Sequence, residues 1–366
     1  EGRDVDHVRR ENHVGLPPVL ARFAGLLGER DGAALHAPLP VARRHWIDAA
    51  LRLLLGGKHG CLATEGIAVG VLVRRRLHGV DFDNRVGQTI DRHIEPHTKE
   101  VLNKWGLAVI EGKNLRAESN QFCGTDMQRA SDLQDAINDN SIKAIICFRG
   151  GYGTVRILES VDFSNLIKNP KWICGYSDVT ALHNYLNGQC NIASMHSSMP
   201  VNFETNTKES LETFRKALFG EKYTIIAETH SLNREGDASG KIIGGNLSML
   251  YSLSGTKYDI DTRGKILFIE DLDEYLYHVD RMMWNLKLSG KLNNLAGLIV
   301  GGMTEMNDND ILFGKQAVEI IKEAVQEYNY PICFNFPCGH IKDNRALILN
   351  KEAKLIVGPS SVIFEQ

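Results

Sequence analysis

The sequence predicts an α/β protein with two domains. Its 366 residues exceed the roughly 100–200 residues of one typical domain. From residue 94 onward, short apolar runs alternate with segments of helical periodicity. A repeated strand–loop–helix pattern is typical of a parallel sheet covered by helices. Hydrophobic residues make up 43% of the chain and charged residues 24%, so there is enough apolar material for a folded core.

In the first predicted domain, residues 94–205, each apolar run is followed by a helical pattern. Met127, Ala130, Leu133 and Ile137 recur at the spacing that puts them on one helix face. The run 144–148 is continuously apolar, as expected for a strand buried on both faces. The pattern predicts helices at 98–105, 126–138, 155–158 and 180–186, and strands at 107–110, 144–148 and 172–174.

Residues 206–240 are polar and mixed, which predicts a linker region before the second domain, residues 241–366. In that domain helical patterns and apolar runs alternate again. The pair Gly358–Pro359 separates two apolar stretches and predicts a turn between two short strands. The other predicted elements are helices at 275–288 and 315–325, and strands at 265–269, 298–300 and 332–336.

Residues 1–93 differ in composition from the rest of the chain. They contain 13 Arg and one Lys, whereas residues 94–366 contain nine Arg and 19 Lys. A separate domain, a fusion segment and a misassigned reading frame all stay open as causes. Helical patterns cover 19–27 and 40–55, and the apolar run 64–73 predicts a strand. Its residues 66–73 are a candidate first strand of the sheet.

Charge and hydropathy exclude several function classes. The 42 basic and 45 acidic residues give a net charge of −3, so no nucleic-acid partner is expected. The longest nearly apolar run, residues 66–73, is far shorter than the roughly 20 residues of a membrane helix. The seven cysteines are odd in number and widely spaced, which predicts reduced, buried thiols in a reducing compartment. No metal site is expected, because Cys333 and Cys338 have no second pair.

Ser177 is the first candidate for catalysis. It follows the predicted strand 172–174 and precedes a helix, and ligands of open α/β sheets gather at the carboxyl ends of strands. A tight strand-to-helix turn lifts a hydroxyl clear of the sheet and points helix N–H groups at an oxyanion. Val179 stands where the usual nucleophile elbow has its second Gly. A helix N-cap is the alternative role for Ser177.

Glu270 and His340 also follow predicted strands. A carboxylate at the end of strand 265–269 has the chemistry to orient a His. The alternative is that the acidic cluster caps the next helix, a role that fits Asp271, Asp273 and Glu274 better than Glu270. A plain surface position is the alternative for His340, although the preceding Gly339 lets the backbone turn sharply. Together, Ser, Glu and His are the groups that a nucleophilic mechanism needs. His196 follows another apolar stretch and is a candidate for support behind the site.

The loop Arg149-Gly-Gly-Tyr-Gly153 follows a strand and opens a helix. It is interpretable as a phosphate cradle, as part of an oxyanion hole beside Ser177, or as a plain tight turn. The dinucleotide fingerprint is weak, because Arg156 takes the place of the third Gly and no acidic residue ends a strand about 20 residues later. The oxyanion-hole interpretation fits the residues better.

Several motifs occur in a fixed order along the chain. They are Arg149-Gly-Gly-Tyr-Gly153, Gly175-Tyr-Ser-Asp-Val-Thr180, Gly244-Gly-Asn-Leu-Ser248, Ile269-Glu-Asp271, Gly301-Gly-Met303 and Gly339-His340. In this order they resemble the LD-carboxypeptidase family of serine peptidases, the muramoyltetrapeptide carboxypeptidases. The resemblance covers residues 95–366. It departs at the N-terminus, where the Arg-rich segment stands in place of the family's short first strand.

The resemblance implies a cofactor-free, cytoplasmic enzyme, commonly a homodimer, that removes the terminal D-Ala of murein tetrapeptides in cell-wall recycling. It implies that the first domain carries the nucleophile Ser177. The second domain would supply His340 as general base and Glu270 as its orienting acid. The backbone N–H groups of Gly151 and Asp178 would form the oxyanion hole. Arg149 is a candidate for binding the substrate carboxylate, and the full set of substrate-binding candidates is Arg149, Tyr152, His196 and Asn246.

Two alternatives share parts of the pattern. A microcin-immunity-type serine peptidase, which cleaves aminoacyl-nucleotide amides, has the same triad but needs an aromatic clamp for the base. The four Trp residues of this chain lie in no obvious pocket loop. The other alternative is a non-catalytic muropeptide- or nucleotide-binding protein, in which a fluorophosphonate would leave Ser177 unmodified.

Overall fold

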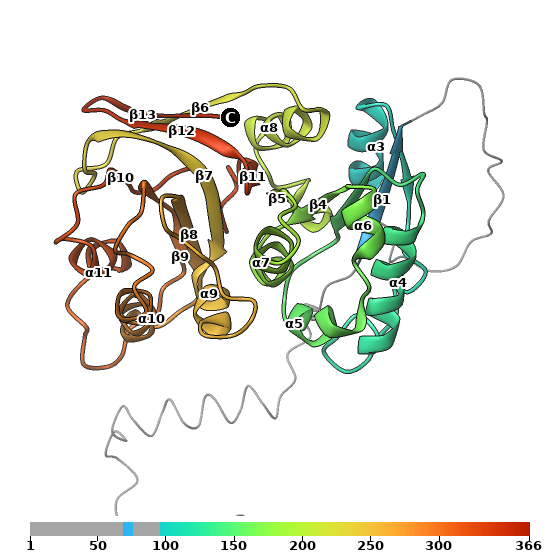
Figure 1. The fold of residues 1–366 in the computed structure, drawn as a ribbon, viewed down its shortest axis with the longest axis horizontal. Helices are drawn as coiled ribbons and strands as arrows, with labels where there is room; N and C mark the ends of the chain where they lie inside the picture. The colour runs from blue at the N-terminus through green and yellow to red at the C-terminus, as the bar shows by residue number, and fades with distance from the viewer. Residues whose placement is uncertain (1–68, 76–95) are drawn as a thin grey trace, which may run out of the picture. The chain divides into compact units, whose positions relative to one another are not determined.

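Two β-sheets with helices packed against them organise the described part of the chain (Figure 1). The computed structural model describes residues 69–75 and 96–366, all within the unit Ala63–Gln366. The helices predicted at 19–27 and 40–55 lie outside these residues. The α/β fold class predicted from the sequence is confirmed.

The first sheet has the strand order β11-β5-β4-β3-β1-β2. Its centre is parallel and consists of β3 (Ala144–Cys147), β4 (Trp172–Gly175) and β5 (Ser194–His196). The outer strands β1 (Val69–Arg75), β2 (Leu107–Ile110) and β11 (Leu347–Leu349) pair antiparallel. The predicted parallel sheet is therefore parallel at its centre and mixed at its edges. β1 overlaps the strand predicted at 64–73.

Helices cover both faces of this sheet, which explains why β3 is apolar throughout. Ile145 packs in one cluster with Leu133 and Leu182, whereas Ile146 packs in the other with Leu102. Successive side chains of a strand point to opposite faces, so both neighbours are buried. The helices of this part are α3 (Pro96–Lys104), α4 (Asp126–Asn138), α5 (Thr154–Ile157), α6 (Ser164–Lys168) and α7 (Thr180–Gly188). Short 3₁₀-helices are η1 (Leu158–Ser160), η2 (Ser177–Val179) and η3 (Pro200–Asn202).

The segment 206–240, predicted as a linker, contains regular structure. It holds α8 (Lys208–Phe219), β6 (Thr224–Glu228) and the start of β7 (Gly236–Asn246). Both α8 and β6 bury only one side, and on β6 Ile225 is buried while Ile226 is exposed. A one-sided helix next to an edge strand gives the mixed, polar composition that obscured these elements.

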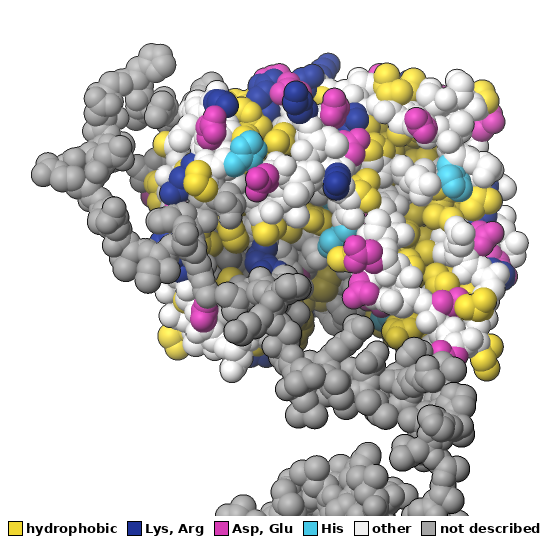
Figure 2. All heavy atoms as spheres, turned by 180° about the vertical axis from the view of Figure 1, so that it is seen from behind, with side chains coloured by type: hydrophobic (Ala, Val, Ile, Leu, Met, Phe, Trp, Pro, Cys, Tyr) yellow, Lys and Arg dark blue, Asp and Glu magenta, His cyan; other side chains and the backbone are white. Residues whose placement is uncertain are grey.

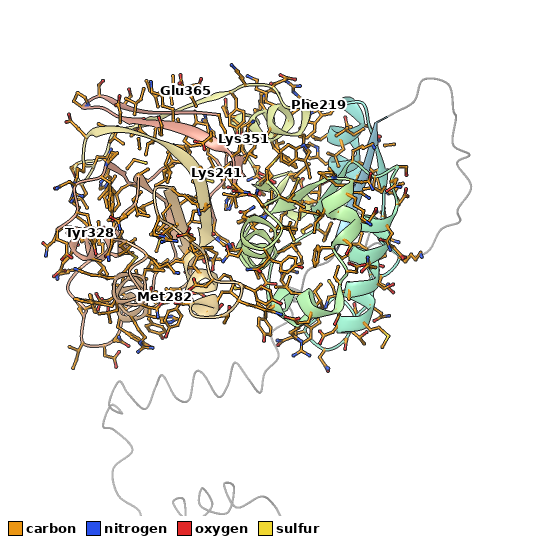
Figure 3. The ribbon with its side chains drawn as sticks, viewed as in Figure 1. Phe219, Lys241, Met282, Tyr328, Lys351 and Glu365 are labelled. Carbon is orange, nitrogen blue, oxygen red and sulfur yellow. The ribbon has the colours of Figure 1, made fainter. Side chains whose placement is uncertain are left out.

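The second sheet has the order β10-β9-β8-β7-β12-β13-β6. Four strands run parallel, namely β7, β8 (Ile266–Leu272), β9 (Gly297–Thr304) and β10 (Ile332–Cys333). β12 (Glu352–Val357), β13 (Ser361–Glu365) and β6 extend it antiparallel. Its helices are α9 (Leu247–Leu253), α10 (Leu276–Leu288) and α11 (Ala317–Ala324). Met282 lies on the buried side of α10 and joins the cluster between these helices and the sheet (Figure 3).

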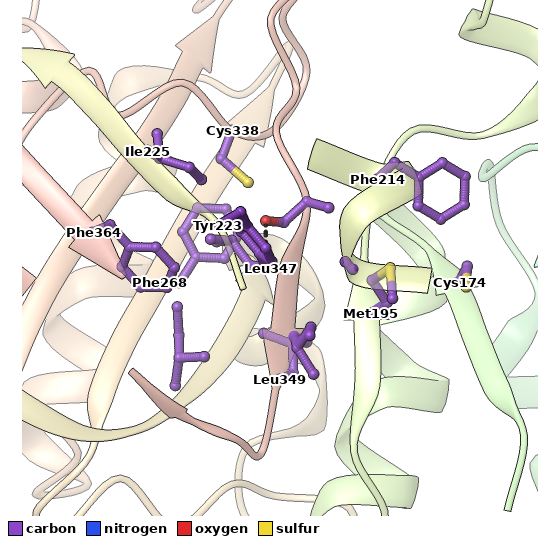
Figure 4. Close-up of a cluster of buried hydrophobic side chains, with 14 of the residues drawn as sticks. Cys174, Met195, Phe214, Tyr223, Ile225, Phe268, Cys338, Leu347, Leu349 and Phe364 are labelled. Atoms are coloured by element: carbon purple, nitrogen blue, oxygen red, sulfur yellow. Dashed lines mark hydrogen bonds between the residues drawn. The ribbon is translucent and has the colours of Figure 1, made fainter. Parts of the chain in front are cut away.

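One hydrophobic cluster contains residues of both sheets (Figure 4). Cys174 and Met195 enter it from the first sheet, and Phe268 and Phe364 enter from the second. Tyr223 joins the cluster and donates a hydrogen bond from its hydroxyl to the carbonyl of Ala346 at 3.1 Å. This shared core connects the strand β4, which leads to Ser177, with the strand β8, which carries Glu270.

The surface is mixed in charge. Figure 2 shows Lys and Arg side chains interspersed with Asp and Glu on one face, in keeping with the small net charge of −3. Among residues 69–75 and 96–366, no helix has both the length and the apolar character needed to cross a membrane.

Candidate active site

Ser177 lies on a sharp turn between β4 and α7. Its φ of 64° is in the left-handed region, which is uncommon for a residue with a side chain and often marks functional turns. Neither η2 nor α7 has a side-chain cap, so the alternative of a helix N-cap is wrong. The side chain is half-buried. The backbone therefore presents the hydroxyl at the carboxyl end of a central strand.

The Gly-rich loop after β3 lies directly against this turn. A Cβ built on Gly150 would come within 2.9 Å of Ser177 Cβ and 3.2 Å of its Oγ, so only Gly fits without movement. Gly151, the next residue, is exposed and has a φ of 120°. Arg156 is held by Asp126, with its Nε 2.9 Å from the carboxylate Oδ2. The close approach of the loop backbone to Ser177 favours the oxyanion-hole interpretation over a phosphate cradle.

Glu270 and His340 form a buried pair. The Nδ1 of His340 lies 2.6 Å from Glu270 Oε2, and the His340 backbone N–H donates to the same oxygen at 3.1 Å. The Glu270 side chain is fully buried and the His340 side chain is 13% exposed. A Cβ on Gly339 would lie 2.7 Å from Glu270 Cβ, so this Gly permits the close approach. The alternatives of a helix cap for Glu270 and a plain surface position for His340 are both wrong.

Glu270 and His340 shift each other's pKa. Burial by itself would raise the pKa of Glu270, but the charge and hydrogen bonds of His340 outweigh it and hold this pKa below its usual value. Burial would likewise lower the pKa of His340, and the charge of Glu270 together with its hydrogen bond raises it above the ordinary 6.5. The pair thus favours a carboxylate beside an imidazole of enhanced basicity.

Tyr176 brings the Ser177 turn next to the His340 loop. Its ring centroid lies 4.8 Å from that of His340 and 5.6 Å from that of His196. Its hydroxyl donates to Asn202 Oδ1 at 3.1 Å, which fixes the ring. Within the described part of the chain, Ser177 Oγ has no hydrogen bond. Catalytic hydrogen bonds are often long in ligand-free enzymes and tighten only when substrate binds.

His196 and Asn344 support the His340 loop from behind. Asn344 Oδ1 accepts the Gly339 N–H at 2.8 Å and lies 3.2 Å from His196 Nε2. His196 is fully buried, and this burial lowers its pKa to about 4, so the ring is neutral. A side chain with no exposed surface has no access to substrate in this conformation. His196 is placed as a support, not as a substrate contact.

Asn246 is also turned inward. Its Oδ1 accepts from the Met249 N–H at 3.1 Å and caps α9, while its Nδ2 donates to Asp271 at 2.8 Å. Asp271 accepts the Ser248 N–H as well, so it caps α9 and not the following helix α10. Burial and the neighbouring Glu270 charge raise the pKa of Asp271 to about 7. Asn246 is 5% exposed and its side chain is engaged within the protein.

Arg149 and Tyr152 are more accessible. Arg149 is half-buried and makes no hydrogen bond or ion pair with any residue of 69–75 or 96–366. Tyr152 is 45% exposed, with its ring 6.0 Å from that of Phe122. Both belong to the loop that approaches Ser177. As for metals, the described residues contain no group of three or more His, Cys, Asp or Glu side chains suited to hold an ion.

Three residues of this region were not identified from the sequence. Tyr176 packs on His340, Asn344 holds Gly339, and Thr154 hydrogen-bonds to Asp178. Tyr176 directly precedes Ser177, Asn344 lies four residues after His340, and Thr154 directly follows the Gly-rich loop. Proximity to a motif was the available signal, but the contacts of Tyr176 and Thr154 join residues that lie far apart in the chain.

Comparison with known proteins identifies the family. Residues 87–197 match the N-terminal domain of LD-carboxypeptidases, and residues 239–355 match their C-terminal domain. The chain is 32% identical over 273 residues to the probable murein peptide carboxypeptidase of Bacillus subtilis, covering 72% of this chain and 84% of that protein. It is 27% identical over 270 residues to the murein tetrapeptide carboxypeptidase of Pseudomonas aeruginosa, covering 70% and 87%.

Solved structures agree with this match. The muramoyltetrapeptide carboxypeptidase of Oxalobacter formigenes superposes with a TM-score of 0.69 at 25% identity, covering 82% of this chain and 97% of that one. The microcin C7 self-immunity protein MccF shares the fold, with a TM-score of 0.66 at 22% identity, covering 74% and 89%. The family matches span both halves of the described structure, and the chain therefore belongs to the LD-carboxypeptidase family of serine peptidases.

Proposed function

We propose that this enzyme is an L,D-carboxypeptidase that releases the terminal D-Ala of murein tetrapeptides through an acyl-enzyme. The observation that carries the proposal is the 2.6 Å contact between His340 Nδ1 and buried Glu270, next to the strained turn of Ser177. A carboxylate on Nδ1 leaves Nε2 free to act as a base. The names of the relatives from Bacillus subtilis and Pseudomonas aeruginosa support a murein peptide as substrate.

In the acylation step, Ser177 Oγ attacks the carbonyl carbon of the L,D-peptide bond while His340 Nε2 takes the hydroxyl proton. The carbonyl oxygen becomes an oxyanion in a tetrahedral intermediate. The carbon–nitrogen bond then breaks, His340 gives its proton to the departing nitrogen, and D-Ala leaves as the free amine. Glu270 stays ionised throughout and stabilises the imidazolium that forms.

Deacylation repeats these steps with water. His340 takes a proton from a water molecule, whose oxygen attacks the ester carbon of the acyl-Ser177. The ester bond breaks, the proton passes to Ser177 Oγ, and the tripeptide leaves as a carboxylate.

The remaining roles follow from the loop that packs on Ser177. The backbone N–H groups of Gly151 and Asp178 would bind the oxyanion, and removing one such donor typically costs about 2.7–4 kcal/mol of barrier. Arg149, a cation in this loop with no partner among residues 69–75 and 96–366, would bind the D-Ala carboxylate. Exposed Tyr152 would contact the peptide. The buried His196 and Asn246 would act only by supporting the site.

The domain assignment and the cellular setting are also part of the proposal. Residues 94–205 would form the nucleophile domain and 241–366 the domain that supplies Glu270 and His340, with 206–240 joining them. The resemblance supports a homodimer that works in the cytoplasm during cell-wall recycling.

The test is release of D-Ala from a purified murein tetrapeptide, measured by mass spectrometry for the wild type and for Ser177→Ala. We expect release by the wild type and a loss of about 10³-fold or more in the variant, because no other nucleophile replaces the hydroxyl. Equal release by both would remove Ser177 from the mechanism. No release by a folded wild type would remove the substrate assignment.

The same assay separates the alternative substrate class. MccF has been solved with glutamyl sulfamoyl guanosine, an aminoacyl-nucleotide analogue. Such a compound is offered to the wild type in parallel with the tetrapeptide. Cleavage of the nucleotide analogue with no release of D-Ala would favour the microcin-immunity type. If the nucleotide analogue is not cleaved and D-Ala is released, the result supports the murein assignment.

A further inference from the structure

The two N–H groups of the proposed oxyanion hole come from different segments. Gly151 belongs to the loop after β3, and Asp178 belongs to η2 after β4. The ladder between these strands fixes the register up to Ile146 and Cys174 but not the loops beyond them. Oxyanion stabilisation requires donors held about 2.7–3.1 Å from the oxygen position, so something must hold one loop relative to the other.

The side chain of Asp178 makes that connection. Its Oδ2 accepts the backbone N–H of Thr154 at 2.8 Å and the Thr154 hydroxyl at 2.5 Å. Thr154 is fully buried and directly follows the Gly-rich loop 149–153. One carboxylate oxygen therefore ties the end of this loop to the residue after Ser177. At the start of the loop, Gly150 already packs against Ser177.

A second contact holds the same loop end from the other side. Arg129 of α4 is buried and donates from Nη1 to the Gly153 carbonyl at 3.0 Å. It also pairs with Asp126. With Gly153 accepting from Arg129 and Thr154 donating to Asp178, the loop end has little freedom to shift. The position of Gly151, two residues earlier, depends on these bonds.

The Asp178 carboxyl is a costly group for a mere packing role. It is 1% exposed, and its Oδ1 has no hydrogen-bond partner among the described residues. Burial raises its pKa, against the opposing effect of the Thr154 and Gly153 hydrogen bonds and of Arg129. Burying an acid with an unpartnered oxygen opposes folding, whereas an apolar residue there would not.

We propose that Asp178 is a positioning residue. Its side chain binds Thr154 and thereby sets the distance between the two N–H groups of the oxyanion hole. The inference rests on the proposed function and adds a role for this side chain beyond its backbone N–H. It predicts that loosening the tether weakens transition-state binding and leaves ground-state binding intact.

The decisive variant is Thr154→Val, which removes the hydroxyl bond and keeps the shape and the backbone N–H. Two rates are measured: kcat/KM for D-Ala release, and the rate of Ser177 labelling by a fluorophosphonate, whose tetrahedral product places an oxygen in the hole. We expect kcat/KM and the labelling rate to fall together by about ten- to a hundredfold. This loss does not exceed the one expected from removing an oxyanion-hole donor. The Kd of the tripeptide product should stay within about twofold, because it carries no oxyanion.

Two controls separate positioning from general loss of structure. Thr154→Ser restores the hydroxyl and should restore both rates. Thr262→Val removes a comparable buried hydroxyl, which donates to the Lys291 carbonyl at 2.6 Å in the second domain, and should leave both rates unchanged. Asp178→Ala breaks both bonds and should give a larger loss of the same kind. If Asp178→Ala does not fold, the rates of Thr154→Val still test the positioning role.

Unchanged rates in Thr154→Val, a tripeptide Kd that rises by the same factor as the rates fall, or an equal loss in Thr262→Val would overturn the positioning role. Absence of fluorophosphonate labelling in the wild type would instead overturn the proposed nucleophile, and the inference with it. Labelling without D-Ala release would overturn only the substrate, and the labelling rates would still test the tether.

Discussion

At the residue scale, the chemistry of the site depends on the environment of single side chains. The Glu270 side chain is shielded from solvent, and its Oε2 contacts the His340 imidazole. His196 sits nearby but is neutral and buried, with a pKa of about 4. The difference comes from the partner: a carboxylate raises the pKa of one ring, whereas burial without an adjacent hydrogen-bonded carboxylate lowers that of the other.

The first prediction at this scale concerns pH. A general base must be neutral, so kcat/KM should fall as pH drops through the pKa of His340, with a midpoint above the ordinary 6.5. Glu270→Gln removes the charge that raises this pKa, so the midpoint should move to lower pH. The rate at the optimum should fall by up to about 10⁴-fold, as in the Ser-His-Asp template. The check is the pH profile of kcat/KM for both proteins.

The dependence of folding stability on pH gives a matched control for that experiment. Because the folded-state pKa of His340 is raised, the stability that His340 contributes is present at low pH and is lost as pH rises through that pKa. The folded-state pKa of Glu270 is lowered, so its contribution is lost instead as pH falls through that pKa. Ser177→Ala should keep the wild-type dependence of stability on pH while losing activity. An unchanged midpoint of kcat/KM in Glu270→Gln would contradict the assigned partner.

At the element scale, helix ends are held by residues from other elements. The last turn of α4 contains no basic residue. Lys171, just before β4, instead donates to the carbonyls of Ala136, Ile137 and Asp139 at 2.7, 2.8 and 2.6 Å. The carbonyls at the end of a helix and the negative end of the helix dipole make this a favourable place for a cation. The contact also fixes α4 against the strand that leads to Ser177.

Lys171→Met tests this contact. It keeps the aliphatic stem and removes three hydrogen bonds, so the free energy of unfolding should fall by about 2 kcal/mol. Lys168→Met is the matched control: Lys168 is exposed and should change stability by no more than about 0.5 kcal/mol. Denaturant unfolding of both variants measures the difference. Equal effects would mean that Lys171 does not hold the end of α4.

At the scale of the whole molecule, the chain crosses between its two sheets more than once. β11 comes from the C-terminal part of the chain but pairs with β5 in the first sheet, with Leu347 opposite His196. The stretch between His340 and β11 contains Asn344, whose carbonyl accepts from Ser210 Oγ at 2.6 Å. The loop that carries His340 is therefore anchored on the sheet that carries Ser177.

Asn344→Ala tests this anchoring. The Gly339 N–H and the His196 ring would lose their acceptor in a buried place, which should lower the free energy of unfolding by about 2–4 kcal/mol. The His340 loop would also loosen, so D-Ala release should fall even where the variant is fully folded. Asn329→Ala, at an exposed position, should change neither quantity. Wild-type activity in folded Asn344→Ala would show that the loop is held without this side chain.

Much of the local structure follows from the sequence by itself. Helix 126–138 and strand 107–110 have the predicted bounds, because apolar periodicity and capping residues are local signals. The residue types of the site were also predictable, since Ser177 follows β4 and His340 lies in the loop after β10. Glu270, expected just after a strand, lies within β8 near its carboxyl end. By contrast α8 and β6 were not recognised, because each buries only one side in contacts distant along the chain.

Tertiary structure decided how these parts meet. Nothing local to Glu270 shows that its partner lies 70 residues away, or that Asp271 caps α9 instead of α10. His196 and Asn246 looked like substrate contacts, and only the packing of both sheets around one core buries them. The sequence determined the elements and the chemical groups, because periodicity and turn chemistry act over a few residues. Burial and pairing between distant segments determined which groups face substrate and which support them.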